Sequence, residues 1–212
     1  FGGAGGAARG YQLAGYKVRS VDIMEQPRSC ADDVWTADAV EFLARNLHRG
    51  LIRNYVLVHL SPPCQAACAL TVGTNAATKG GNHVDLIPVL RPLLYMLGLA
   101  GIPYVIEQPT GKAPIRKDVT LCGEMFGLGV IRHRNFELSG WGRDVVQPVH
   151  PSHRGPVRGW RHGVYRDGPY VAAYGEGGGK ASVVEMQTAM GIDWTDNRRE
   201  LTEAIPPAYT EW

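Results

Sequence analysis

An apolar segment that stops at two prolines and a cysteine constrains the fold of this chain more than any other feature. Residues 55–60 are mostly apolar and predict a buried strand. Pro62 and Pro63 end that strand and stiffen the turn, because proline lacks an N–H and has a fixed φ. In an open α/β sheet, ligands bind at such carboxyl ends of strands. Cys64 follows at once, so we expect a nucleophile in a rigid loop; a small buried hydrophobic residue is the alternative.

The first ten residues are rich in glycine and predict a ligand-binding loop. Glycine lets the backbone approach a ligand closely, and the amino end of the helix expected from Ala7 to about Leu13 would offer N–H groups to an anion. The strand expected at residues 17–23 contains Asp22 near its end, where an acid commonly binds a ribose hydroxyl. The glycine spacing is not GxGxxG, so a dinucleotide is not the first choice.

Two further acids lie at the ends of predicted elements. Asp38 precedes an amphipathic helix that ends near Gly50, so it is either a helix cap or a contact to an adenine amino group. Glu107 ends an apolar strand at residues 102–106. A buried carboxyl group tends to stay protonated, and Glu107 would then donate a hydrogen bond to a ring nitrogen.

Arginines dominate the segment from 131 to 166. Arg132 and Arg134 alternate in an extended segment, which predicts that both guanidinium groups lie on one face and bind phosphates or base carbonyls. A solvated edge strand is the alternative. Further along, arginines and a tryptophan are interleaved with glycines, a composition suited to phosphate contacts and base stacking. A poorly ordered loop is the alternative there. The predicted contacts are Arg154, Arg158, Trp160 and Arg161.

Composition narrows the class of protein. The chain has 212 residues, 44% of them apolar, which suffices for one α/β domain and a small appendage. We expect neither a transmembrane segment nor a signal peptide. The four cysteines form no CxxC pair, so we expect a reduced cytoplasmic protein without a metal site.

Together these segments resemble the DNA cytosine-5 methyltransferases, in the same order and along nearly the whole chain. Residues 62–65 match the catalytic PCQ loop, the first residues match the FxGxGG loop, and residues 204–209 read AIPPAY as in compact phage-type members. The family's Glu-Asn-Val signature reads Glu107-Gln108-Pro109 here. The match begins inside the first motif, so most of the family's first strand would precede Phe1.

The resemblance implies roles for individual residues. The catalytic residues would be Cys64, Glu107, Arg132 and Arg134. S-adenosylmethionine would be bound by Phe1, Gly3, Ala4, Gly5, Gly6, Asp22, Ile23, Asp38, Ala39 and Pro62. Gln65 would contact DNA together with the arginines and the tryptophan named above.

It also implies an architecture and a reaction. We expect a doubly wound, mostly parallel, Rossmann-like α/β sheet from residues 1–138 and 181–212, and a small irregular basic lobe for target recognition from residues 139–180. The expected protein is a monomer that methylates carbon 5 of a flipped cytosine in double-stranded DNA through a Cys64 adduct, in a bacterium or a phage-infected host, in a restriction-modification or phage setting. An RNA methyltransferase of the tRNA type and an inactive DNA-binding relative are the alternatives.

Overall fold

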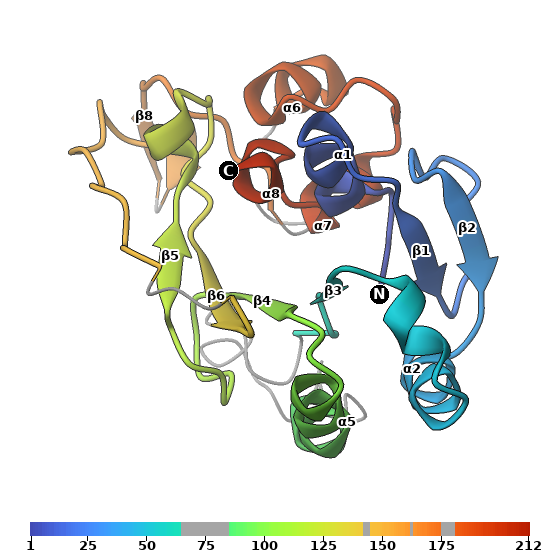
Figure 1. Cartoon of the computed structure of the whole chain (residues 1–212). Coiled ribbons are helices and arrows are strands. Elements are labelled where there is room, and N and C mark those ends of the chain that lie inside the picture. The colour runs from blue at the N-terminus through green and yellow to red at the C-terminus, as the bar shows by residue number, and fades with distance from the viewer. Residues whose placement is uncertain (65–84, 142–144, 162, 175–180) are drawn as a thin grey trace. The chain divides into compact units, whose positions relative to one another are not determined.

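The computed structural model divides the chain into two compact units, which we describe separately (Figure 1). It describes residues 1–64, 85–141, 145–161, 163–174 and 181–212. The first unit comprises Phe1, Ala37–Thr120 and His133–Pro148. The second comprises Gly2–Thr36, Leu121–Arg132 and Val149–Trp212.

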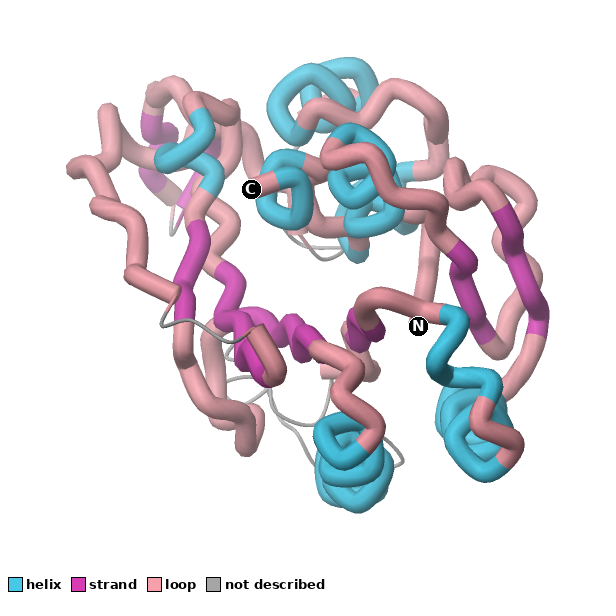
Figure 2. The backbone as a smooth tube through the Cα atoms, in the orientation of Figure 1, coloured by secondary structure: helices cyan, strands magenta, loops and turns pink. Residues whose placement is uncertain are grey.

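A four-stranded sheet organises the first unit, in the order β3-β4-β6-β5 (Figure 2). β3 (Val58–Leu60) runs parallel to β4 (Tyr104–Pro109), and β4 runs antiparallel to β6 (Arg134–Ser139). β5 (Val119–Leu121) lies beside β6 at the edge, with its last residue in the second unit. β4 is the most buried strand, as its apolar sequence predicts.

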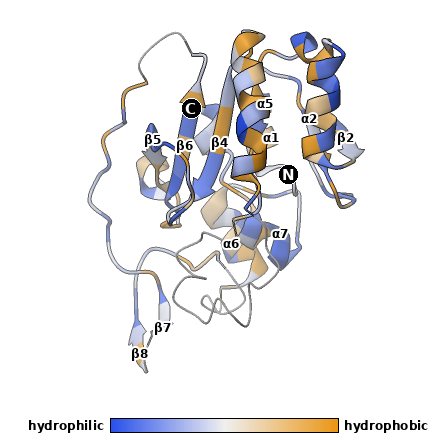
Figure 3. Ribbon diagram, turned by 90° about the horizontal axis from the view of Figure 1, so that it is seen from below, coloured by the Kyte–Doolittle hydropathy of each residue, from blue (hydrophilic) through white to orange (hydrophobic). Residues whose placement is uncertain are grey.

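Helices α2 (Ala39–His48) and α5 (Ile87–Leu99), with the 3₁₀ turn η1 (Leu51–Asn54), complete the first unit. α5 carries mostly hydrophobic residues (Figure 3) and begins one residue before Pro88. Its proline at 92 lies inside the helix. The buried core comprises Leu43, Ile52, Leu60, Leu90, Leu94, Leu97, Tyr104 and Ile106.

The prediction of a doubly wound, mostly parallel sheet is wrong. Only one pair of strands in the four-stranded sheet is parallel, and β1 (Arg19–Asp22) and β2 (Asp33–Thr36) form a separate two-stranded sheet. A parallel connection needs a crossover, usually a helix. α5 supplies that crossover between β3 and β4. Residues 110–133 are all described and contain no α-helix, so β6 returns antiparallel to β4.

The second unit combines helices with two small sheets. Its helices are α1 (Gly6–Leu13), α6 (Val183–Met190), α7 (Arg198–Glu203) and α8 (Ala208–Glu211). β1 pairs with β2, and β7 (Gly159–Arg161) pairs antiparallel with β8 (Val164–Arg166). The 3₁₀ turn η2 (Gly123–Phe126) also belongs here. The buried core comprises Val130, Ala173, Ala181, Met186, Ala189, Met190, Ile192 and Leu201.

Close packing of α1 against α8 explains one glycine in the first helix. A Cβ on Gly10 would lie 2.1 Å from the carbonyl oxygen of Pro207 and 2.1 Å from Oγ1 of Thr210. Thr210 Oγ1 also donates a hydrogen bond to the carbonyl of Ala7. Residues 204–209, the AIPPAY segment, therefore return to the amino-terminal helix.

The two compact units divide the chain differently from the expected catalytic domain (1–138 with 181–212) and recognition lobe (139–180). Those lobes were defined by function, and they stay a prediction.

Candidate active site

The loop that carries Cys64 follows directly after β3. Pro62 is buried, and Cys64 is half-buried and outside any disulfide. His59 on β3 lies 3.1 Å from Ser61, measured from Nε2 to Oγ. Burial lowers the pKa of His59 to about 4, although the residue as a whole keeps intermediate exposure. The strand before the loop therefore carries a neutral imidazole at pH 7.

Gln108 ties this loop to the neighbouring strand. Leu60 is the register partner of Ile106, so Ser61 and Pro62 leave β3 beside Glu107 and Gln108 of β4. The side-chain amide of Gln108 is buried and donates a 2.7 Å hydrogen bond to the carbonyl of Pro62. Gln108 thus holds the loop that carries Cys64 in place.

Glu107 and Arg134 form the charged pair beside the loop. Glu107 is 5% exposed, and its Oε1 lies 2.8 Å from Nε of Arg134. The distance is that of an ion pair, but the alignment is not that of a hydrogen bond, and Oε1 has no hydrogen-bond partner among the described residues. Pairing of Pro109 with Arg134 in the β4–β6 register brings the two side chains together. The carboxyl group is therefore buried, oriented and able to accept or share another hydrogen bond.

The two predicted catalytic arginines have different partners, contrary to the expectation of a shared face. Arg132 lies in the second unit, where its guanidinium donates to the carbonyls of Ala173 and Thr202, the latter at 2.7 Å. Its own carbonyl accepts a 2.6 Å hydrogen bond from Tyr209. β6 begins only at Arg134, so the two-residue alternation of a strand does not extend to Arg132. Arg132 is buried and joins three segments of its own unit.

The glycine loop and Asp22 lie together in the second unit. Gly3 has φ +48°, and a Cβ there would meet no atom within 4 Å, so this position is open to a ligand. The carboxylate of Asp22 accepts hydrogen bonds from the N–H groups of Gly3 at 3.1 Å and Met24 at 3.0 Å. Burial acts against ionisation, but these bonds prevail and lower the pKa of Asp22.

The remaining predicted cofactor residues have mixed surroundings. Ala4 is buried, and its carbonyl accepts a 2.7 Å hydrogen bond from Trp194. Gly5 and Gly6 form the start of α1, and Ile23 is exposed. Phe1 packs against the core of the first unit.

Asp38 is the N-cap of α2, which confirms the helix-cap interpretation. Its Oδ1 accepts a 2.9 Å hydrogen bond from the N–H of Glu41. Ala39 is the first residue of that helix and is half-buried. A contact from Asp38 to an adenine stays a prediction.

Acids from elsewhere in the second unit pair with two of the predicted DNA-binding arginines. Arg154 Nε lies 3.0 Å from Glu124, and Arg158 forms an ion pair with Glu185. Both acids come from outside the arginine-rich segment, so its own composition did not reveal these ion pairs. Trp160 is 70% exposed and meets the ring of Tyr165 edge-on. Gln65 and the side chain of Arg161 lie outside the described structure.

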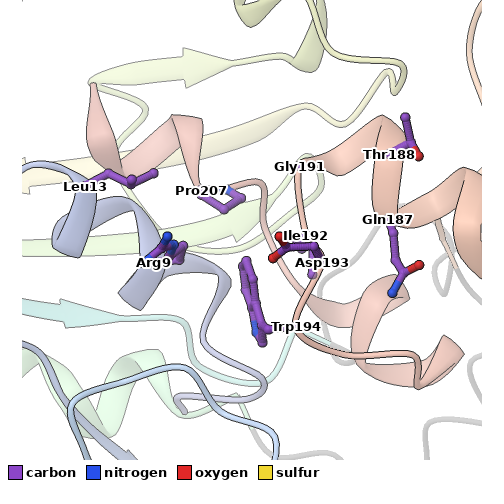
Figure 4. A pocket seen from close by; sticks show the side chains of 9 residues that line it. All are labelled: Arg9, Leu13, Gln187, Thr188, Gly191, Ile192, Asp193, Trp194 and Pro207. Atoms are coloured by element: carbon purple, nitrogen blue, oxygen red, sulfur yellow. The ribbon is translucent and has the colours of Figure 1, made fainter.

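A shallow hollow of about 460 Å³ lies elsewhere in the second unit (Figure 4). None of the residues proposed for catalysis lines it. Its walls come from α1, the end of α6 and the following loop, and include Arg9, Asp193 and Trp194. The groups with the relevant chemistry lie at the strand ends instead, so we assign the candidate site there.

Two residues with structural roles in the site were not identified from the sequence. Gln108 was noted only as a departure from a signature, and nothing in its spacing showed that it reaches Pro62. His59 is an ordinary strand residue by pattern, and its burial is visible only in the fold.

No protein-family model matches the chain, and no curated protein sequence matches it. Among the described helices, none has the length and apolar character needed to cross a membrane.

Proposed function

We propose that this chain is a DNA cytosine-5 methyltransferase with Cys64 as its nucleophile. The observation that carries the proposal is the parallel pairing of β3 with β4. It brings the Cys64 loop and Glu107 to the same edge of the sheet, and the bond from Gln108 to Pro62 fixes the loop there. A rigid thiol beside a buried carboxyl group is the arrangement that addition to a pyrimidine ring requires.

Cys64 performs the step that activates the base. Carbon 5 of cytosine is a poor nucleophile, and addition of the Cys64 thiolate to carbon 6 gives it enamine character. After carbon 5 has been methylated, a base, for which water can serve, takes its proton; the electron pair of that C–H bond forms the carbon 5–carbon 6 double bond, and the carbon–sulfur bond breaks to release the thiolate. The target carbon is inaccessible inside a duplex, so the cytosine must be flipped out first.

Glu107 and Arg134 serve the opposite edge of the same ring. Addition at carbon 6 places negative charge on the ring, and a hydrogen bond from Glu107 to ring nitrogen 3 stabilises it when the carboxyl group carries a proton. Arg134 keeps the Glu107 side chain in one orientation through their ion pair. It also offers guanidinium N–H groups suited to a base carbonyl or a phosphate.

The residues of the glycine loop fit S-adenosylmethionine. Gly3 leaves room for close approach of a ligand to the backbone. Asp22 is ionised at neutral pH, and beyond the bonds from Gly3, Met24 and the side chain of Gln26 its two oxygens, with about four acceptor positions, retain capacity for a ribose hydroxyl. The cofactor, when bound, supplies an electrophilic methyl group. The other predicted cofactor residues, Phe1, Asp38, Ala39 and Pro62, belong to the first unit.

Covalent trapping tests the proposal directly. A duplex containing 5-fluorocytosine should form an adduct with the full chain that survives denaturation, because fluorine at carbon 5 cannot leave as a proton does. Cys64→Ser should form no adduct, since a hydroxyl is a far weaker nucleophile. Cys68→Ser is the matched control, four residues further along the same segment, and should retain the adduct.

The outcomes separate the alternatives. An adduct on tRNA but not on duplex DNA would favour the RNA methyltransferase. DNA binding without an adduct on either substrate would favour an inactive relative. An undiminished adduct in Cys64→Ser would overturn the assignment of the nucleophile. The proposal also includes a monomer that acts in the cytoplasm of a bacterium or an infected host.

A further inference from the structure

Three potential metal ligands converge in the second unit, and none of them is proposed above for catalysis, cofactor binding or DNA contact. Cys122 is buried at the start of η2, while His150 and His153 lie on the exposed segment that follows residue 148. The sulfur and one ring nitrogen from each histidine lie within 4.8 Å of one another. The cysteine spacing predicted no metal site because the histidines are distant in sequence and follow no zinc-finger pattern.

The distance between Cys122 and His153 suits a shared metal ion. Sγ lies 3.5 Å from Nε2. A tetrahedral zinc ion, with Zn–S of about 2.3 Å and Zn–N of about 2.1 Å, separates its sulfur and nitrogen ligands by about 3.6 Å. A thiol–imidazole hydrogen bond would account for this distance alone. It would not account for the third ligand atom from His150.

The ring of His150 is oriented as that of a metal ligand usually is. Its Nδ1 lies 2.6 Å from the carbonyl oxygen of Pro151, so Nδ1 carries the proton and Nε2 carries the lone pair. Metal-bound histidines almost always donate their other ring N–H to a carbonyl or carboxylate in this way. The rings of His150 and His153 meet edge-on, with centroids 5.0 Å apart.

Contacts beside the three ligands hold residues 149–154 in place and neutralise the charge of Arg154. Arg154 follows His153 and is ion-paired with Glu124, so it does not repel a metal ion with an uncompensated charge. The backbone N–H of Arg154 donates to the hydroxyl of Tyr170 at 2.8 Å, and that hydroxyl donates to Glu124. The ring of Tyr170 is fully buried and meets that of His153 edge-on.

We propose that Cys122, His150 and His153 bind one zinc ion, which anchors residues 149–154 to η2. Thiolate and imidazole ligands together suit Zn²⁺ better than Mg²⁺ or Ca²⁺, which prefer oxygen. His133 follows Arg132 of this unit in the chain and is the candidate for a fourth ligand, with water as the other choice. Because residues 149–154 lead into Arg158 and Trp160, the ion would fix the base of the predicted DNA-contact segment.

Metal titration of the full chain tests this site without any methyl-transfer assay. After removal of metal with a chelator, Co²⁺ should bind with one equivalent per chain and give the near-ultraviolet absorption of a thiolate-to-cobalt transition, and Zn²⁺ should displace it. Cys122→Ser should remove that absorption. His150→Ala and His153→Ala should each weaken zinc binding by about tenfold or more. His48→Ala, an exposed histidine on α2, is the matched control and should bind like the wild type.

Several results would overturn the site. Less than one equivalent of bound metal would do so, as would a thiolate absorption that persists in Cys122→Ser. Equal zinc affinity in the His150, His153 and His48 variants would also do so. The two histidine variants change exposed side chains, so they report on the site even if replacement of the buried Cys122 prevents folding. A reduced affinity in His133→Ala would identify the fourth ligand, and an unchanged affinity would assign that position to water.

Discussion

At the scale of the residue, His59 should make folding sensitive to mild acid. Its pKa is lowered to about 4 by burial, against about 6.5 in an unfolded chain. Between these values the unfolded chain binds the proton first, so this contribution to stability is complete above pH 6.5 and is lost as the pH falls toward 4. At pH 5 the loss should be about 2 kcal/mol. The free energy of unfolding, measured in urea from pH 7 to 5, should depend less steeply on pH in His59→Gln than in the wild type. An unchanged pH dependence would show that the pKa of His59 is not lowered by folding.

Gln108 makes a structural contact that no sequence motif predicted. The proline-cysteine pair predicted a stiff loop from local chemistry alone, and that loop follows β3 as expected. The contact that fixes the loop comes from the neighbouring strand, β4. It depends on the register of β3 and β4, because pairing of Leu60 with Ile106 places Pro62 beside Gln108. An asparagine is one methylene shorter and would not span the same distance from β4. This contact therefore depends on the length of the glutamine side chain.

At the scale of the element, a buried ion pair joins α5 to the sheet. Glu137 on β6 is fully buried and is bound by Arg91 of α5, with Nη2 to Oε2 at 2.9 Å. Burial acts to raise the pKa of Glu137, but the hydrogen bonds from Arg91 and from the N–H of Arg116 prevail and lower it. Glu137→Gln should cost about 1.5–3 kcal/mol, the range for hydrogen bonds to charged groups, because the Arg91 side chain is 37% exposed and water can solvate its charge once the carboxylate is gone.

Urea unfolding at pH 7 measures this cost, and the chain offers a matched control. Glu41→Gln removes one partner of the exposed i,i+4 pair with Arg45 on α2. Exposed pairs of this kind contribute about 0.3–0.5 kcal/mol, so the control should stay close to the wild type. Equal effects of the two substitutions would show that Glu137 does not join the helix to the sheet.

The strands show which structural features could be predicted from the sequence and which could not. The apolar runs before Pro62 and Glu107 predicted β3 and β4, because burial of a whole strand is visible as composition. The residues around 131–138 predicted an extended segment, and β6 forms there from Arg134 onward. Its buried glutamate, at position 137, was unremarkable in the sequence since its partner lies 46 residues away. The pairing of distant charges depends on register, which local patterns do not contain.

At the scale of the whole molecule, the wrong sheet topology has a specific cause. The resemblance implied a doubly wound, mostly parallel sheet, and the strands expected from the sequence were assigned to it. The chain length between β4 and β6 allowed a crossover helix, but the described residues there form β5 and η2 instead. The candidate site does not depend on the predicted topology, because the parallel pair β3 and β4 alone brings the Cys64 loop and Glu107 to one edge of the sheet. The proposed cofactor residues divide between the two units, as Asp22 and Asp38 show.

Charge across the molecule gives the last prediction, which rests on DNA as the substrate. The net charge is only +2, and Glu185 pairs with Arg158. Glu185 also caps α6 through Ser182, a role that glutamine can fill, so Glu185→Gln removes the charge and keeps the cap. Arg158 can then reach a phosphate, and the log–log dependence of DNA affinity on salt should steepen by about one unit.

A second substitution separates this local effect from net charge. Glu203→Gln changes the charge of the molecule by the same amount and removes the partner of Arg199 on α7, which is not a predicted DNA contact. Filter binding or fluorescence anisotropy over a range of salt concentrations should give a steeper slope for Glu185→Gln alone. If both variants steepen it equally, attraction follows net charge rather than the position of Arg158. If neither does, Arg158 is not a phosphate contact, and DNA recognition must lie in other residues.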